Sequence, residues 1–276
     1  MPDNKMQVQA VTKIFDTVAS HYDCPALRFF PMVADQLIAR IKPASSSKHL
    51  DIATGTGMVA IAACQAVGQS GRVTGIDLSE NMLQQAQKNL SHRGYGNIDF
   101  HQMDAGDLEF KDRYFDSASC SFGIFFLPDP AKALKSWLRV LKPGATIGLT
   151  TFGVDAMMPM MQNFLQQVES MDISILGSKK IEAFRNPEHC LQLLTDAGFQ
   201  NAACETKQMG YHLAKAEDWW EMLYHSGTRG LIEQIPAERL SAFMQQQLQQ
   251  ADSMKTCDGI WLNLPIHFFT ATKKTL

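Results

Sequence analysis

The feature that most constrains the fold of this chain is a glycine-rich turn between a predicted strand and a predicted helix. The turn closes the segment Leu50–Gly57, an apolar run follows, and the carboxylate of Asp77 ends the next predicted strand. Glycines let the backbone approach a ligand where a side chain would collide, and the free amides that start a helix face its polar end. A carboxylate after the second strand can accept hydrogen bonds from both hydroxyls of a ribose. The pattern therefore predicts an α/β domain that binds an adenosine-containing cofactor.

Two cofactors compete for this pattern. Gly55–Ala60 satisfies the dinucleotide fingerprint with alanine in its third position, and Asp77 lies about 20 residues further on, where an acid that binds NAD is expected. Asp51 argues against a dinucleotide, because a carboxylate four residues before Gly55 would repel a pyrophosphate. The same carboxylate suits a ligand that carries an ammonium and a sulfonium group. S-adenosylmethionine is such a ligand.

Five sequence signals, in order, resemble the motifs of class I S-adenosylmethionine-dependent methyltransferases. They are Leu50–Gly57, Gly75–Ser79, Met103–Ala105, a fourth strand that opens at Phe115-Asp116 and ends near Phe122, and Val140–Ala145. Together they span about the central third of the 276 residues. The resemblance implies a Rossmann-like α/β fold. Its sheet would have seven strands, mostly parallel with an antiparallel last strand, together with N-terminal helices and a helical insertion or lid.

The alternation of short strands and helices predicts βαβ units and a parallel sheet, with the ligand outside the carboxyl ends of the strands. The expected strands are His49–Ala53, Arg72–Asp77, Ile98–Met103, Tyr114–Ser121, Thr146–Thr151, Ala202–Leu213 and Trp261–Lys273. The expected helices are Val8–Ser20, Pro25–Ile41, Met58–Val67, one from Ser79 to Arg93, Pro130–Leu141, Pro187–Ala197 and the helical pattern of Glu217–Gln250. Val154–Arg185 is expected to form helices over the cofactor.

This reading divides the chain into an N-terminal helical cap (residues 1–47), a cofactor-binding core (48–153), and a helical lid with the last strands (154–276). A formal charge of −3 gives no general attraction to nucleic acid. We find no stretch that resembles a signal peptide and none that approaches the ~20 apolar residues needed to span a bilayer. The six cysteines include no close pair, which favours reduced thiols over a metal site or disulfides. We therefore expect a cytoplasmic protein that binds no nucleic acid and no metal.

Each expected cofactor residue has a defined role. Asp77 should take the ribose hydroxyls, or else cap the next helix. Asp104 should accept from the adenine amino group while the Ala105 amide donates to the ring, although Asp107 is close enough to confuse the register. Leu78 and Met82 are expected to sandwich the adenine, or simply to belong to the core. The full set is Tyr22, Asp51, Ala53, Thr54, Gly55, Thr56, Gly57, Asp77, Leu78, Met82, Asp104, Ala105, Ser121 and Phe122.

The N-terminal segment Val11–Asp23 resembles the opening of the quinone-biosynthesis C-methyltransferases. The resemblance implies that this segment folds over the cofactor, with Tyr22 on the methionine moiety and Phe15 closing the pocket. The alternative is an apolar helical stripe. Cys24–Arg28 departs from the pattern of those enzymes, so quinone specificity does not follow.

Methyl transfer is an in-line displacement, so the protein mainly aligns the reacting groups and excludes water. The catalytic residue is unknown from sequence. His21, His225 and His212 are candidates for a general base if the acceptor is a hydroxyl or an acidic carbon. Ser121 and Phe122 should line the acceptor side. Apolar residues suggest an adaptable pocket, although core packing would explain them too; they are Phe125, Phe126, Phe152 and the methionines of 157–161.

The leading hypothesis is a methyltransferase that acts on oxygen, nitrogen or carbon of a small, apolar or aromatic molecule. The alternatives are an NAD(P)-dependent oxidoreductase and a non-catalytic module that binds S-adenosylmethionine. Trp219 and Trp220 could anchor a lid or a homodimer.

Overall fold

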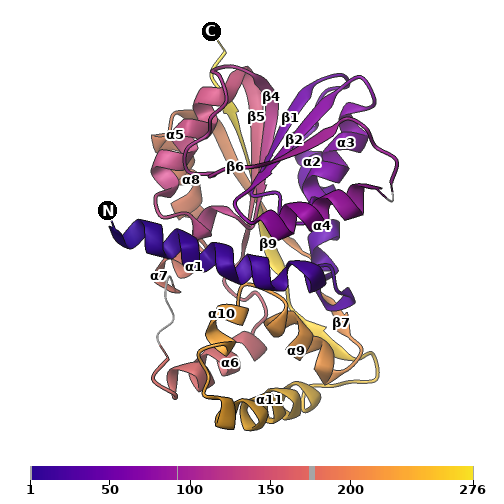
Figure 1. Ribbon diagram of the computed structural model, residues 1–276, viewed down its shortest axis with the longest axis vertical. Helices are drawn as coiled ribbons and strands as arrows, with labels where there is room; N and C mark the ends of the chain where they lie inside the picture. Colours follow the sequence, from indigo (N-terminus) through magenta and orange to yellow (C-terminus); the bar gives the residue numbers. More distant parts are fainter. Residues whose placement is uncertain (1, 92, 174–177, 276) are drawn as a thin grey trace.

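The structure is a computed structural model that describes residues 2–91, 93–173 and 178–275 (Figure 1). Its main sheet has seven strands in the order β3-β2-β1-β4-β5-β9-β6. They are β1 (Lys48–Ile52), β2 (Arg72–Asp77), β3 (Ile98–Gln102), β4 (Phe115–Ser121), β5 (Leu141–Phe152), β6 (Phe199–Gln208) and β9 (Pro265–Lys273). The first five strands are parallel, and β9 runs antiparallel to both β5 and β6. The expected Rossmann-like sheet with an antiparallel last strand is confirmed.

Helices cover both faces of this sheet (Figure 1). One group packs on β1 to β5 and comprises α2 (Phe29–Ile41), α3 (Met58–Val67) and α4 (Glu80–Ser91); the other packs on β5, β6 and β9 and comprises α5 (Pro130–Val140) and α8 (Pro187–Asp196). Both α5 and α8 begin with proline after a capping side chain, Asp129 and Asn186 respectively, each of which accepts from a backbone N–H of the first turn. Local sequence thus sets where these two helices start.

A second, mostly helical part lies below the sheet in Figure 1. It contains α6 (Met160–Glu169), α9 (Ala216–Tyr224), α10 (Arg229–Ile232), α11 (Ala237–Asp252) and a small sheet of β7 (Tyr211–Leu213) and β8 (Ile260–Leu262). Trp219 is buried there, and its indole N–H donates to the buried Gln247 side chain at 3.1 Å. Trp219 is therefore an internal packing residue rather than a surface anchor.

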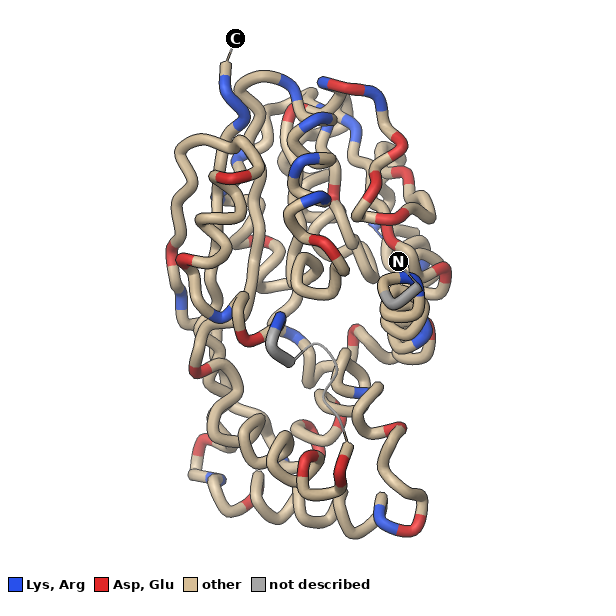
Figure 2. The backbone as a smooth tube through the Cα atoms, turned by 90° about the vertical axis from the view of Figure 1, so that its left-hand side faces the viewer, with Lys and Arg blue, Asp and Glu red and all other residues tan. Residues whose placement is uncertain are grey.

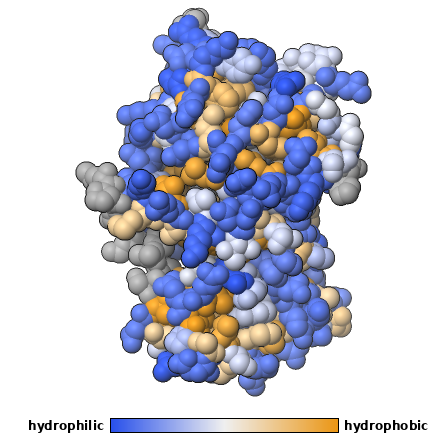
Figure 3. Space-filling view, in the orientation of Figure 1, coloured by the Kyte–Doolittle hydropathy of each residue, from blue (hydrophilic) through white to orange (hydrophobic). Residues whose placement is uncertain are grey.

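The N-terminal helix α1 (Pro2–Val18) contacts both α4 of the upper part and α10 of the lower part. The short turn η1 (Ala19–His21) continues it against α4, and η2 (Pro25–Leu27) then contacts α9 before α2 begins. Basic and acidic residues are interspersed along both parts of the backbone (Figure 2). Hydrophobic residues show on the surface of the lower part, around α6 (Figure 3).

The predicted bounds are wrong in the C-terminal third. The single strand expected over Ala202–Leu213 is two strands, because the chain turns at Gly210 and enters the small sheet. A Cβ atom at Gly210 would lie 2.5 Å from the Leu262 carbonyl oxygen, so the turn requires glycine. The strand expected over Trp261–Lys273 is likewise interrupted, between β8 and β9.

Two predicted helices are also divided, and one strand is longer than expected. The pattern of Glu217–Gln250 forms three helices, α9, α10 and α11, while Pro25–Ile41 forms η2 followed by α2. Strand β5 extends over Leu141–Phe152, beyond the expected Thr146–Thr151. In the region expected to form helices over the cofactor, α6 packs on α11, and α7 (Ser178–Ala183) contacts η3 (Ile124–Phe126). Residues 174–177 of that region lie outside the described residues.

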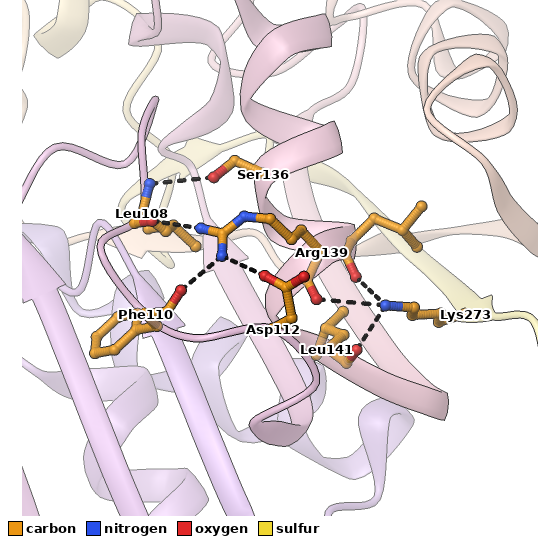
Figure 4. Close-up of polar contacts among 8 residues, drawn as sticks. Leu108, Phe110, Asp112, Ser136, Arg139, Leu141 and Lys273 are labelled. Atoms are coloured by element: carbon orange, nitrogen blue, oxygen red, sulfur yellow. Dashed lines mark hydrogen bonds and ion pairs between the residues drawn. The ribbon is translucent and has the colours of Figure 1, made fainter.

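The segment between β3 and β4 is held by the side chains of Ser136 and Arg139 of α5 (Figure 4). The Arg139 guanidinium donates to the carbonyl oxygens of Leu108 and Phe110 and pairs with Asp112 at 2.8 Å. Lys273 donates to the carbonyl oxygen of Leu141 at 2.8 Å and so ties the end of β9 to the start of β5. The Arg139 contacts fix the backbone that follows the third strand.

Candidate active site

The carboxyl ends of β1 and β2 bring together the glycine turn and Asp77. The Asp77 carboxylate accepts from the Gly55 N–H at 2.9 Å and from the Ser79 N–H at 3.0 Å. Asp77 thus lies against both the glycine turn and the residue that precedes α4. The side chain that caps α4 is Ser79, whose hydroxyl accepts from the Met82 N–H at 3.1 Å. Burial raises the pKa of this carboxyl, and the backbone N–H donors oppose the rise.

Close packing explains why the turn needs glycine at position 57. Gly57 has φ +86°, and a Cβ atom there would lie 3.1 Å from both Ala86 and the Phe100 ring. Ala53, which precedes the turn, also has a positive φ of 55°. A non-glycine residue in this conformation is strained, and such residues concentrate at functional sites.

Asp51 is almost fully buried, with 1% of its surface exposed, and two hydroxyls donate to it. Thr54 Oγ1 donates at 2.6 Å and Ser119 Oγ at 2.7 Å. Burial raises the pKa of Asp51 to about 6, against the effect of these two hydrogen bonds. A buried carboxylate that is ionised at neutral pH is well suited to meet a positively charged ligand group.

The hydrogen bonds behind Asp51 reach a buried histidine that the sequence reasoning missed. His49 Nε2 lies 2.8 Å from Ser119 Oγ, and His49 Nδ1 lies 2.8 Å from Ser117 Oγ. Burial lowers the pKa of His49 to about 3, so the imidazole is neutral. A signal was present, because His49 and Asp51 are two apart on one strand and so share a face of the sheet.

Two aspartates of the N-terminal segment form hydrogen bonds with residues around the glycine turn and α4. These contacts were not predicted from the sequence. Asp16 accepts from the Ser79 hydroxyl at 2.6 Å. Asp23 accepts from the Thr56 hydroxyl at 2.6 Å and from the Asn89 amide at 2.7 Å. The segment before α2 is thus fastened to the glycine turn and to both ends of α4.

Tyr22 belongs to the same N-terminal segment and lies near the carboxylates of Asp77 and Asp23. Its ring stacks on Phe30 with centroids 4.8 Å apart and meets Phe15 edge-on at 6.1 Å. Burial raises the pKa of the Tyr22 phenol, and the charges of Asp77 and Asp23 raise it further, so the phenol keeps its proton. Met82 is 1% exposed and packs with Val18 and Ala19 of the same N-terminal segment.

The segment after β3 carries the residues expected at the adenine. Asp104 is exposed and accepts from the Gly106 N–H at 2.7 Å, while Ala105 is buried and its carbonyl oxygen accepts from Trp137 at 2.7 Å. Asp107 faces Lys132 of α5 at 3.5 Å. Gln102 donates to the Leu78 carbonyl oxygen at 2.9 Å and so joins the ends of β2 and β3.

Aromatic side chains gather beside the ends of β4 and β5. Phe122 has φ +54° and stacks on Phe152 with centroids 4.5 Å apart. Further rings in contact around this pair are Phe29, Phe30, Phe125, Phe126 and, through Phe126, Phe15. We call this set the aromatic cluster. The neighbouring Ser121 hydroxyl and Thr150 hydroxyl are 2.8 Å apart.

The structure brings two of the three candidate histidines together. The rings of His21 and His225 stack with centroids 4.9 Å apart and an interplanar angle of 15°. Burial lowers the pKa of His225, and the neighbouring His21 lowers it further. Gly227 of the same turn approaches both Phe126 and Phe15, so the pair adjoins the aromatic cluster. His212 lies apart, against Trp261 in the small sheet.

Metal sites, disulfides and membrane-spanning helices are absent from the described residues. Within them, no three His, Cys, Asp or Glu side chains come close enough to hold a metal ion, and all six cysteines are free thiols. None of the described helices has the length and apolar character needed to cross a membrane. A cavity of about 600 Å³ lies at the opposite, amino ends of β1 and β2, beside Lys48 and Arg72. It contains none of the expected site residues.

The strand order, the glycine turn between β1 and α3 and the carboxylates at the carboxyl ends of β1 and β2 define a class I S-adenosylmethionine-dependent methyltransferase. Comparison with known proteins makes this more specific. The chain belongs to the ubiE/COQ5 methyltransferase family, which it matches over residues 3–215. The enzyme therefore uses S-adenosylmethionine and methylates a small molecule. Neither the oxidoreductase nor the non-catalytic module is favoured.

Individual relatives differ in what their names say they act on. The ubiquinone/menaquinone biosynthesis C-methyltransferase UbiE of Francisella philomiragia is 32% identical over 209 residues, which cover 69% of this chain and 83% of that protein. The aklanonic acid methyltransferase DauC of a Streptomyces species is 34% identical over 151 residues, or 55% of this chain and 68% of that one. Phosphoethanolamine N-methyltransferase 2 of Haemonchus contortus, solved with S-adenosyl-L-methionine, shares the fold. Its TM-score is 0.56 at 19% identity, over 88% of this chain and 53% of that one.

Proposed function

We propose that the methyl acceptor is an apolar or aromatic small molecule that docks against the aromatic cluster. The observation that carries this proposal is the position of the cluster, beside the ends of β4 and β5 and next to Tyr22, which lies near Asp77. Phe29, Phe122 and Phe125 of the cluster are buried. The half-buried rings, Phe15, Phe30, Phe126 and Phe152, are the ones that offer contact area without directional demands. The relatives named for ubiquinone/menaquinone and for aklanonic acid support an acceptor of this class.

The residues of the turn and strand ends fit the cofactor. Bound S-adenosylmethionine supplies a methyl group activated by its sulfonium. Asp51 would hold the ammonium group, the glycine turn from Ala53 to Gly57 the methionine part, and Asp77 the ribose hydroxyls. At the adenine, the side chains of Leu78 and Met82 would pack on the ring, and Asp104 and the Ala105 amide would bind its edge. Tyr22 would contact the methionine part, and Ser121 and Phe122 would line the side that faces the acceptor.

We further propose that His225, next to His21, takes a proton from the acceptor. A general base must be neutral at the working pH, and the lowered pKa of His225 meets this requirement. The hydrogen bonds of Asp16 and Asp23 hold the N-terminal segment over the site, where it would exclude water.

The same division of roles suggests three functional parts: a cap (residues 1–47), a cofactor core (48–153) and a lid with the last strands (154–276). The interspersed charges of Figure 2 agree with a small acceptor rather than nucleic acid. A cytoplasmic location and a homodimer stay predictions from the sequence.

The test begins with thermal unfolding in the presence of S-adenosylhomocysteine, NAD or NADP at equal concentrations. A ligand at ~100 times its dissociation constant adds about 2.7 kcal/mol to the free energy of unfolding. We expect stabilisation by S-adenosylhomocysteine alone. Release of S-adenosylhomocysteine is then measured over a panel of quinols, phenols, aromatic acids and aliphatic amines. Turnover confined to the aliphatic amines would contradict the proposed acceptor class while leaving the cofactor untouched.

A further inference from the structure

A continuous line of buried polar groups runs from the cofactor side of the sheet into its interior. It consists of Thr54, Asp51, Ser119, His49 and Ser117, joined by contacts of 2.6 to 2.8 Å. Asp51, Ser119, His49 and Ser117 are each no more than 3% exposed. Buried polar groups are costly unless each is satisfied, so a line of this length inside a sheet calls for a reason.

Counting donors and acceptors assigns a direction to every bond. An ionised Asp51 only accepts, so the single proton of the Ser119 hydroxyl points to it. The Ser119 oxygen must then accept, and the only proton between it and His49 is on Nε2. Because burial keeps His49 neutral, its Nδ1 has no proton and accepts from the Ser117 hydroxyl. All of these protons point toward Asp51.

We infer that His49 is a positioning residue that acts through Ser119 to orient a hydroxyl onto Asp51 and keep this carboxylate ionised for the cofactor's ammonium group. The inference rests on the role proposed for Asp51. Hydrogen bonds aligned in one direction polarise one another, so the Nε2–H of His49 makes Ser119 a stronger donor to the carboxylate. A donor to the charged form of a carboxyl favours that form.

The charge of Asp51 depends on its hydrogen-bond donors because of the groups that surround it. The titratable groups that face it are His49 on its own strand, Asp77 at the end of β2 and the Cys120 thiol on β4. Burial raises the pKa of Cys120, so the thiol stays neutral, and Asp77 adds repulsion. No described cation is among these groups. The hydroxyls of Thr54 and Ser119, with the Ala60 N–H, are therefore what stabilises the charge before the cofactor arrives.

The experiment compares affinity for S-adenosylhomocysteine from pH 5.5 to 8.5 in wild type and His49→Leu, by isothermal titration calorimetry. With 5′-methylthioadenosine as a second probe, the ammonium group is absent, so the pH dependence seen only with S-adenosylhomocysteine belongs to Asp51. We expect the wild-type affinity to weaken below about pH 6 and the midpoint to rise by about one pH unit in His49→Leu. If only ionised Asp51 binds, this shift weakens affinity roughly fivefold at pH 6 and by almost nothing at pH 8.5.

Matched variants separate orientation from packing. In His49→Gln an amide can still donate to Ser119, and we expect the midpoint to return toward the wild-type value. Thr151→Val removes a buried hydroxyl on β5 that lies outside this line of groups and should leave the midpoint in place. If His49→Leu does not fold, Ser119→Ala breaks the same link and should raise the midpoint in the same direction.

A direct readout comes from ¹⁵N NMR of histidine-labelled protein, in which His49 should carry its proton on Nε2. A proton on Nδ1, or an equal loss of affinity at every pH in His49→Leu, would overturn the inference and leave the proposed function standing. If wild type bound no S-adenosylhomocysteine at any pH, the proposed function would fall and this inference with it.

Discussion

The two sides of the candidate site are built on different physical principles. On the cofactor side, Asp51, Asp77 and the glycine turn are held by hydrogen bonds of 2.6 to 3.0 Å, most of them to backbone or buried hydroxyl groups. On the acceptor side, the aromatic cluster is held by ring contacts. Directional bonds define one ligand geometry, whereas apolar contacts tolerate many. The contrast suits a fixed cofactor and an acceptor that differs between relatives.

The largest effect is expected on the acceptor side, at His225. If this residue is the general base, His225→Ala should lower kcat by about 100-fold or more and leave affinity for S-adenosylhomocysteine unchanged. The pKa of His225 is lowered, so in wild type kcat should rise with pH, and the midpoint of the rise should lie below the ordinary histidine value of 6.5. His21→Ala removes a group that lowers this pKa and should move the rise to higher pH. An unaltered pH profile of kcat in His21→Ala would contradict the role of His225 as the general base.

On the cofactor side, we expect substitution of Asp77 to weaken cofactor binding by a factor similar to the loss of kcat in His225→Ala. In Asp77→Ala the acceptor of two ribose hydroxyls is lost, at about 3 kcal/mol or roughly 100-fold in the dissociation constant of S-adenosylhomocysteine. Asp77→Asn keeps one acceptor oxygen and should lose less. The KM for the methyl acceptor should change little in either variant. A parallel rise in that KM would mean that the two sides are not separate.

For Asp51 we predict an effect on the pH dependence of the free energy of unfolding. Its pKa is raised from 3.8 to about 6 on folding, so its contribution is fully present below about pH 4 and is lost as the pH rises through about 6. The cost of keeping it ionised at pH 7 is about 3 kcal/mol. The free energy of unfolding of Asp51→Asn minus that of wild type should therefore increase by this amount between pH 4 and pH 7. Denaturant titrations at several pH values measure it, and a constant difference would show that Asp51 ionises normally.

Phe126 should give the smallest effect. Phe126→Leu keeps an apolar side chain at the edge of the aromatic cluster, so the acceptor KM should change by about two- to threefold while affinity for S-adenosylhomocysteine stays the same. Phe110→Leu, in the segment between β3 and β4, serves as the matched control away from the cluster. A loss of cofactor affinity in Phe126→Leu would contradict the division into two sides.

Much of the fold was predictable because its signals are local. Helix α3 and strand β2 have the predicted bounds, Met58–Val67 and Arg72–Asp77, since the glycine turn and the apolar runs mark their ends. The cap at Asn186 is likewise confirmed by its hydrogen bond to the Glu188 N–H. The errors came where a turn depends on a distant neighbour, as at Gly210, whose backbone lies against Leu262.

The sequence by itself determined the class of fold, the cofactor and the carboxylates at the ends of the first two strands, because each depends on residues close together in the chain. Only the tertiary structure decided what surrounds those carboxylates. The Ser119 hydroxyl reaches Asp51 from 68 residues away, and Asp16 reaches Ser79 from 63. The tertiary structure also places the ring of His21 against that of His225. A hydrogen bond or a ring contact depends on distance and direction in space, and only the sheet register and helix packing bring such partners within reach.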